Sequence, residues 1–254
     1  MGVELFIAVK YLKAKRKEGF ISLISFLSVA GVAVGVMALV VVIAVMSGAE
    51  TDFRKRILGV EPHILLMNYT GKFDADPDLL SAITHHKEIT ATAPILFAQA
   101  MIRTKHSFSG LMVRGIDPEK GFSLVKDFDA DRLQAALGRN ASGSISPGIV
   151  LGRELANTIG AGKGDTVLLI SPEGFASPIG HLPSMNQFRV TDIFSSGMYE
   201  YDSALAYIHL DEAQKLTKNP KKLSAIGLWI DDVFDVKSVK KHLSSLVEYP
   251  FYSR

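Results

Sequence analysis

Apolar residues divide the chain into a short, densely apolar N-terminal segment and a long segment of mixed composition. Between Gly19 and Ala49 there is no Asp, Glu, Lys or Arg. About 20 apolar residues in a helix are enough to cross the hydrocarbon core of a bilayer, and a longer run can tilt. A helix is also the only single segment that crosses lipid with its backbone polar groups satisfied. The pattern predicts a transmembrane helix at residues 20–48, followed by a domain at residues 49–254.

A cleaved signal peptide is the alternative explanation for this run. The apolar region of a signal peptide has about 7–15 residues and ends at a small-residue cleavage site. The run here is about twice that length, and Met46-Ser47-Gly48-Ala49 is a poor cleavage site. We therefore expect an uncleaved membrane anchor.

The charged residues that flank the span predict its orientation. The basic side chains on the N-terminal side are Lys10, Lys13, Lys15, Arg16 and Lys17. Positive flanks stay in the cytoplasm, so residues 1–19 are predicted to be cytoplasmic and the large domain to be exported. The first 48 residues hold five basic and two acidic side chains, which leaves 23 and 24 for the rest. An exported domain so near neutrality is not expected to bind nucleic acid.

Gly31 and Gly35 form a G-x-x-x-G pair inside the predicted span. Such a pair lets two helices approach closely in lipid, which indicates packing against another membrane helix. The alternative is that glycine is simply more common in membrane helices than in soluble ones.

The exported domain alternates short predicted strands and helices, which indicates the α+β class. The predicted strands are residues 60–68, 89–104, 110–115, 166–170, 188–194, 204–209 and 223–230. The predicted helices are residues 77–86, 129–137, 148–159, 211–217 and 233–247, and the membrane helix is expected to continue through residues 53–58. Gly160 is predicted to end the third of these helices in the left-handed conformation.

No catalytic or metal-binding motif is complete. The segment Gly160 to Asp165 has the glycine density of a phosphate-binding loop, but Gly164 stands where Ser or Thr would ligate magnesium. A turn before a strand explains that segment better. The acidic series at residues 74–78 and 127–131 lack the glycine and glutamate of a calcium loop, and the chain has no cysteine nucleophile. We predict a non-enzyme with no metal and no cofactor of its own.

Residues 171–187 form an unusual connection between two predicted strands. The segment holds three prolines, Pro172, Pro178 and Pro183, with four large apolar residues among them. Proline lacks the amide donor, so neither a helix nor a central strand is expected here. A hairpin needs only two to five loop residues. The segment is predicted to be either a loop tucked onto the domain or a protruding recognition arm.

Five sequence blocks, taken in order, resemble the lipoprotein-releasing permeases LolC and LolE. The blocks are residues 4–22, Val45-Met-Ser-Gly-Ala, Arg56-Ile-Leu-Gly-Val-Glu-Pro-His-Ile, Gly115-Ile-Asp-Pro, and Gly197-Met-Tyr-Glu-Tyr-Asp followed by Ala206-Tyr207. They extend across nearly the whole chain.

This resemblance implies the permease subunit of a MacB-like, mechanotransmission ABC transporter in the bacterial inner membrane. The family's periplasmic domain would divide here into a Porter-like part, about residues 49–105 and 200–254, and a Sabre-like insert, about residues 106–199. Three further membrane helices would be absent from this chain. The implied activity is extraction of lipoproteins from membrane lipid and their transfer to the periplasmic carrier LolA. A LolD-like ATPase would bind the ATP, and a LolE-like subunit or a second copy would complete the permease.

The resemblance also changes the interpretation of residues 171–187, because LolC-type subunits carry a proline-rich hook that recruits the carrier and LolE-type subunits do not. Residues 177–184 resemble that hook, with His181 where a longer basic residue is expected. The predicted contacts are Pro172, Phe175, Pro178, Ile179, Gly180, His181, Leu182, Pro183, Met185 and Gln187. The prolines would order the arm before binding and lower its entropy cost.

Two alternatives stay open at the level of sequence. Another MacB-like permease, for efflux or for regulation of cell division, has the same transporter type. A membrane-anchored periplasmic binding or scaffold protein belongs to a different class. The encoded length separates the classes, since three more apolar spans after Arg254 would support the permease.

Overall fold

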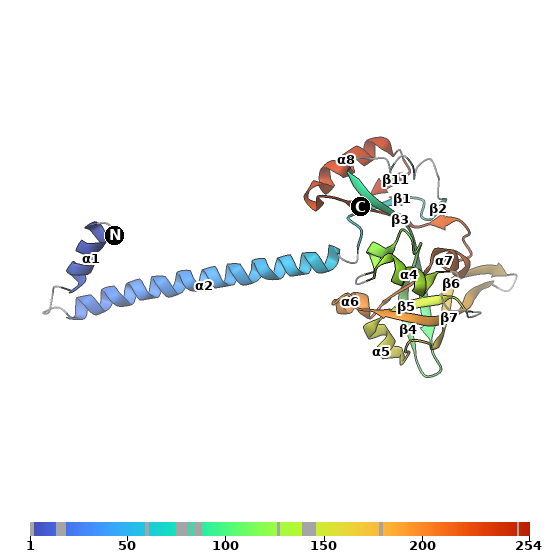
Figure 1. The fold of residues 1–254 in the computed structure, drawn as a ribbon, viewed down its shortest axis with the longest axis horizontal. Helices are drawn as coiled ribbons and strands as arrows, with labels where there is room; N and C mark the ends of the chain where they lie inside the picture. The colour runs from blue at the N-terminus through green and yellow to red at the C-terminus, as the bar shows by residue number, and fades with distance from the viewer. Residues whose placement is uncertain are drawn as a thin grey trace. The chain divides into compact units, whose positions relative to one another are not determined.

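The computed structural model describes residues 3–13, 19–58, 61–74, 81, 83, 88–125, 128–138, 146–177, 180–247 and 249–254. The chain divides into two compact units, Met1–Arg54 and Lys55–Arg254. Figure 1 shows the N-terminal helices in blue and the mixed helix-and-strand unit in the remaining colours.

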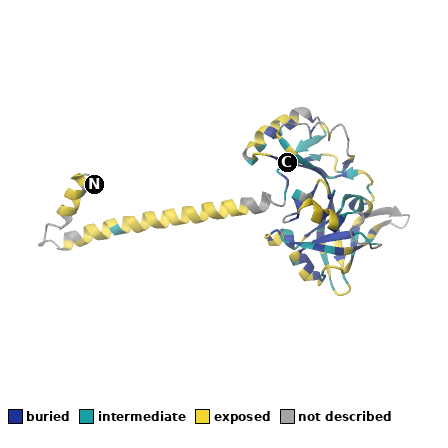
Figure 2. Ribbon diagram, viewed as in Figure 1, coloured by how far each residue is buried: buried dark blue, intermediate teal, exposed yellow. Residues whose placement is uncertain are grey.

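The N-terminal unit is helical. Helix α1 is Val3–Lys13, and α2 begins at Gly19 and ends at Leu58, so it includes the predicted span and the predicted extension. Among the described residues, Leu23–Phe53 is the one stretch long and apolar enough to cross a membrane, with a mean hydropathy of 2.9. The large apolar side chains from Leu23 to Phe53 are exposed (Figure 2). Such a surface requires lipid or protein around it, because water disfavours this much exposed apolar area.

Two predictions concern this unit, namely helix packing at Gly31 and Gly35 and a basic flank before the span. A Cβ atom added at Gly31 or Gly35 would meet nothing within 4 Å, so both positions are open to a neighbouring helix. Helix packing there stays a prediction. Lys10 lies on α1, whereas Lys15, Arg16 and Lys17 fall outside the described residues.

Six strands of the second unit close into a barrel. In spatial order they are β3 (Ile89–Arg103), β4 (Phe108–Ile116), β8 (Leu205–His209), β5 (Gly148–Gly152), β7 (Gly180–Phe194) and β6 (Thr166–Ser177). β6 then pairs back onto β3, with Met101 opposite Ile170 and Arg103 opposite Leu168. Closure leaves no unpaired edge along the barrel wall.

Strand β3 is long enough to belong to a second sheet as well. Its first half pairs with β10 (Ala225–Ile230), which continues to β1 (Ile64–Asn68) and β11 (Phe251–Ser253). Helix α8 (Val236–Leu246) packs on this sheet through Val239 and Leu243. A small two-stranded sheet joins β2 (Phe73–Asp74) and β9 (Lys222–Leu223). β3 therefore runs through both sheets. The boundary between the Porter-like and Sabre-like parts at residues 105–106 stays a prediction.

Three hydrophobic cores stabilise the second unit. The first takes residues from one face of all six barrel strands, and therefore fills the barrel, together with α5 (Arg153–Ile159) and α7 (Leu210–Leu216). The second lies under α4 (Ala130–Leu137), and the third lies under α8. The remaining short helices are α6 (Tyr199–Asp202), η1 (Phe122–Leu124) and η2 (Val233–Asp235).

Most predicted elements are present, and the α+β class is confirmed. Asp129 caps α4 by accepting a hydrogen bond from the Arg132 amide at 2.7 Å, and Gly160 ends α5 in the left-handed conformation with φ of 63°. Residues 160–165 are a turn before β6, as expected. The helix predicted at residues 77–86 lies mostly outside the described residues.

Two predictions are wrong. The helix expected at residues 148–159 is a strand over its first five residues, because Gly148–Gly152 is inserted between β7 and β8 and is buried on both faces. The loop expected at residues 171–187 is instead a continuation of β6 and β7 as a hairpin.

Candidate docking arm

Residues 171–187, called the arm from here on, form the end of a long β-hairpin. β6 makes its last pair with β3 at Ile170, and beyond that residue the hairpin strands pair with each other as far as Ser177 opposite Gly180. Figure 1 shows this end of β6 and β7 projecting from the barrel. Among the described contacts, the strand pairing that holds the arm to the barrel lies at its base.

A bulge interrupts the hairpin at that base. Ser171 pairs with Ser184 and Phe175 pairs with Leu182, so four residues of advance along β6 face two along β7. Bulges bend a strand and change the direction of the residues beyond them, and they tolerate proline because the ladder is already broken. This geometry explains how Pro172 and Pro183 fit into a hairpin that their presence would otherwise oppose.

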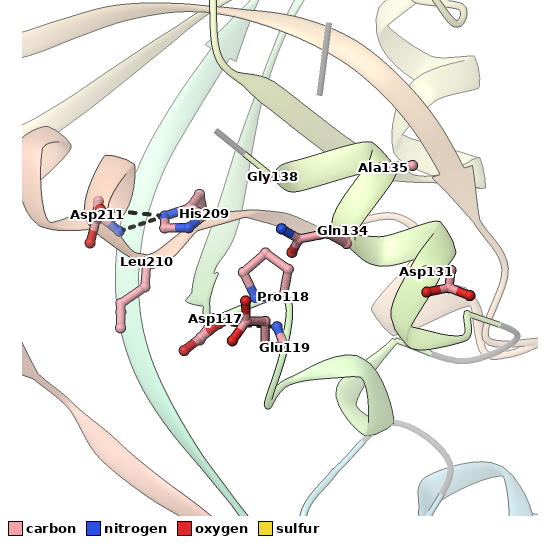
Figure 3. A pocket seen from close by; sticks show the side chains of 10 residues that line it. All are labelled: Asp117, Pro118, Glu119, Asp131, Gln134, Ala135, Gly138, His209, Leu210 and Asp211. Atoms are coloured by element: carbon pink, nitrogen blue, oxygen red, sulfur yellow. Dashed lines mark hydrogen bonds and ion pairs between the residues drawn. The ribbon is translucent and has the colours of Figure 1, made fainter. Parts of the chain in front are cut away.

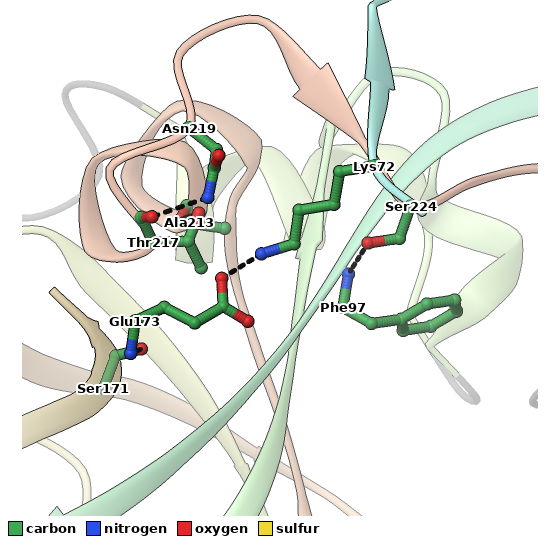
Figure 4. Close-up of polar contacts among 8 residues, drawn as sticks. All are labelled: Lys72, Phe97, Ser171, Glu173, Ala213, Thr217, Asn219 and Ser224. Atoms are coloured by element: carbon green, nitrogen blue, oxygen red, sulfur yellow. Dashed lines mark hydrogen bonds and ion pairs between the residues drawn. The ribbon is translucent and has the colours of Figure 1, made fainter. Parts of the chain in front are cut away.

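Polar contacts hold the bulge in place. Ser171 and Ser184 are buried. The Glu173 amide donates to the Ser171 hydroxyl at 3.2 Å, and the Ser184 hydroxyl donates to Asn186 Oδ1 at 3.3 Å. The Glu173 carboxylate forms an ion pair with Lys72, which comes from the turn before β2 (Figure 4).

The arm exposes apolar side chains. Leu182 is 39% exposed and Met185 is 58% exposed. Pro183, Met185 and Gln187 share one face of β7, because alternate residues of a strand point the same way. Single exposed apolar residues are common on protein surfaces, so the position of these two on a projecting element is what makes the arm a candidate interaction site.

The other predicted arm contacts lie partly outside the described residues. Pro172 is exposed at the bulge. Phe175, Gly180 and His181 lie on the two strands, and the placement of their side chains is outside the described part of the chain. Pro178 and Ile179 fall outside the described residues.

Sequence reasoning missed an ion pair between Glu61 and Arg114. Arg114 lies on β4 and is 7% exposed. Its guanidinium also lies 5.7 Å from the centre of the Phe97 ring and 6.0 Å from that of Tyr201. The signal was present in the sequence, because Glu61 lies inside one resembling block and Arg114 directly precedes another.

Burial acts against the charge of Arg114, yet its neighbours raise its pKa above the ordinary value. Tyr207 and Glu61 are the main neighbours that do so. Burial raises the pKa of Tyr207, whose hydroxyl donates to the Leu124 carbonyl at 2.7 Å, so this phenol is neutral at physiological pH. Glu61 therefore supplies the counter-charge, and the pair is a structural anchor.

A second ionic cluster is centred on Asp192 of β7. Arg132 Nε donates to its carboxylate at 2.8 Å, and Lys163 forms a further ion pair with it. Burial tends to raise the pKa of Asp192, but the hydrogen bonds from Arg132 and Lys163 hold it below its ordinary value. The cluster joins α4, the turn before β6 and β7 into one unit.

One cavity has a volume of about 810 Å³ and an acidic lining. Figure 3 shows Asp117, Glu119, Asp131 and Asp211 around it, with His209 Nδ1 accepting from the Asp211 amide at 3.1 Å. Within the described ranges, no three His, Asp or Glu side chains are grouped to hold a metal ion.

Comparison with known proteins identifies the family. The model of the MacB-like periplasmic core domain matches residues 25–246. The lipoprotein-releasing system transmembrane protein LolC of Neisseria meningitidis is 35% identical over 234 residues, which are 91% of this chain and 55% of that protein. LolE of Haemophilus influenzae is 25% identical over 98% of this chain and 60% of that protein.

Among solved structures, the periplasmic region of MacB from Actinobacillus actinomycetemcomitans aligns with a TM-score of 0.48 and 15% identity. That alignment covers 78% of this chain and 89% of that one. The chain spans little more than half the length of these LolC and LolE relatives. From the match over residues 25–246, the chain belongs to the family of the MacB-like periplasmic core domain.

Proposed function

We propose that this chain is part of the permease of an ABC transporter that releases lipoproteins from the bacterial inner membrane. The observation that carries the proposal is the 35% identity to a lipoprotein-releasing LolC protein over 91% of the chain. The apolar helix and the mixed domain that follows it fit this function. The helix would anchor the chain in the membrane, and the lipoproteins would meet the chain at the membrane surface. The N-terminus would be cytoplasmic and the domain periplasmic.

The energy would come from a partner. We assign ATP binding to a LolD-like ATPase and no catalytic or cofactor-binding residue to this chain. A second permease subunit, either LolE-like or another copy, would pack against the open Gly31 and Gly35 face of α2.

The arm would recruit the periplasmic carrier LolA. Its exposed Leu182 and Met185 supply apolar contact area, and the hairpin ladder with its prolines reduces the entropy lost on binding. A strand of the partner could also pair with an edge of the hairpin through backbone hydrogen bonds.

A LolE-like role is the second candidate. The observation in its favour is the match to LolE over 98% of the chain. The two candidates differ in the arm, because a subunit without carrier-docking function has no use for an exposed apolar hairpin at this position.

The test is capture of purified LolA by the full chain in detergent micelles, with and without residues 174–184. The deletion removes the hairpin end and leaves the three hydrophobic cores intact. The control for folding is the thermal unfolding midpoint of both forms. The midpoint of the deletion form should lie within a few degrees of that of the full chain. Capture that is lost with the deletion supports a carrier-docking permease, and equal capture by both forms contradicts it.

A further inference from the structure

We propose that Lys72 is a positioning residue that sets the direction of the arm through its ion pair with Glu173. This inference rests on the proposed function in one respect, that the arm's direction matters for docking the carrier. The residues that carry it lie outside the predicted contact set.

The arm needs an external brace. Beyond Ile170 the hairpin has lost its pairing with β3, and an isolated two-stranded hairpin is only marginally stable in water. The bulge between Ser171 and Phe175 adds residues that the ladder does not hold. The direction of everything beyond the bulge therefore depends on contacts made at the bulge itself.

Glu173 is in a position to make that contact. It lies within the bulge, and its amide is fixed to the buried Ser171 hydroxyl at 3.2 Å. Figure 4 shows the Glu173 carboxylate extending toward the Lys72 ammonium, which comes from a strand turn 101 residues earlier in the chain. This contact joins the arm to the turn that precedes the small two-stranded sheet of β2 and β9, rather than to the barrel.

The backbone on both sides of Lys72 is held in place by neighbouring contacts. The next residue, Phe73, is buried in the third core and meets Phe251 edge to face with ring centres 5.1 Å apart. The preceding Gly71 adopts φ of 96°, and its amide donates to the Asn68 carbonyl at 3.0 Å. The Lys72 backbone is thus fixed on both sides, and its side chain transmits that fixed position to Glu173.

The expected size of the effect follows from exposure. The Lys72 side chain is 22% exposed and that of Glu173 is 42% exposed. Pairs of this kind shift an equilibrium by up to about five-fold. We expect Lys72→Glu, which replaces attraction by repulsion, to weaken carrier affinity about three- to ten-fold, and the exchanged pair Lys72→Glu with Glu173→Lys to recover most of it.

The control is Lys222→Glu. Lys222 lies on the neighbouring β9 and pairs with Asp74 at 2.9 Å, so it offers the same charge change in the same small sheet without contact to Glu173. It should leave carrier affinity and arm geometry unchanged.

The experiment measures two quantities on the full chain in detergent. The first is the dissociation constant for purified LolA. The second is the distance distribution between spin labels at Gly180→Cys on the arm and Phe108→Cys on β4, which the absence of native cysteine makes specific. Lys72→Glu should broaden or shift the distribution, and the exchanged pair should restore it.

The two readouts separate the two claims. A changed distribution with restoration, in a chain that does not bind LolA, supports the brace and overturns carrier docking. An unchanged distribution in Lys72→Glu overturns the brace whether or not LolA binds. A changed distribution without restoration by the exchanged pair also overturns it, since the ion pair would then not be the cause.

Discussion

Glu61 and Arg114 form an ion pair inside the second unit although they are 53 positions apart in the chain. Glu61 comes shortly after the end of α2 at Leu58, and Arg114 belongs to the wall of the barrel. The pair connects the segment that follows α2 to β4, which is one of the six strands of the barrel.

Replacing Glu61 by Gln should destabilise the second unit by roughly 3 kcal/mol, because a buried guanidinium then lacks its counter-charge. The unfolding free energy from denaturant titration measures the loss. Glu119→Gln is the matched control, since Glu119 is exposed on a turn, and it should change stability by less than about 0.5 kcal/mol. Equal effects of the two variants would contradict the anchor.

Gly115 and Gly110 lie on the same strand and give a second matched pair. A Cβ atom at Gly115 would stand 2.2 Å from the Cβ of Ala213 on α7, whereas nothing lies within 4 Å of one at Gly110. Gly115→Ala should therefore cost about 1–3 kcal/mol by forcing α7 away from β4. Gly110→Ala should be close to neutral. A thermal unfolding series on both variants decides the point.

His63 should make the stability of the second unit depend on pH. Burial lowers its pKa below 6.5, and the Ile230 amide donates to its Nδ1 at 3.2 Å. Because the unfolded chain takes up the proton at higher pH than the folded one, stability present above pH 6.5 is lost as the pH falls through the folded pKa.

The variant that tests this is His63→Asn, which keeps an acceptor for the Ile230 amide but does not titrate. Its stability should vary less than that of the parent chain between about pH 7 and pH 5. His106→Asn, on an exposed turn, is the control. An unchanged slope in His63→Asn would show that another group is responsible.

A charge at either exposed apolar side chain of the arm should weaken docking. Leu182→Asp or Met185→Asp places a carboxylate where an apolar partner surface is expected, and each should weaken LolA binding at least ten-fold. Tyr199→Asp changes a more exposed aromatic residue outside the arm and should leave the affinity unchanged. Isothermal titration calorimetry measures the affinity of each of the three variants, and their thermal unfolding midpoints show whether the fold is retained.

Elements whose patterns are local could be predicted from the sequence. The apolar helix, the short helix predicted at residues 129–137 and the end of α5 at Gly160 depend on residues next to one another. The strand at Gly148–Gly152 could not be told from helix, because a short, continuous apolar run has no distinguishing period. Only its insertion between β7 and β8 makes it a strand.

The arm illustrates the same limit. Pro172 and Pro183 argue against strands, yet the bulge removes the ladder bonds that proline would have broken. The Glu61–Arg114 and Lys72–Glu173 pairs join residues that are 53 and 101 positions apart. Barrel closure through Met101 and Ile170 brings together strands whose order no local pattern encodes.

The most direct test of the central claim is site-specific photo-crosslinking from the arm. A benzophenone amino acid at Leu182 of the full chain, in membranes with purified LolA, should give a crosslinked product of the combined mass. The same group at Phe108, which is 69% exposed on β4, should give little or none. A product from Phe108 but not from Leu182, or none from either, would contradict recruitment of the carrier by the arm.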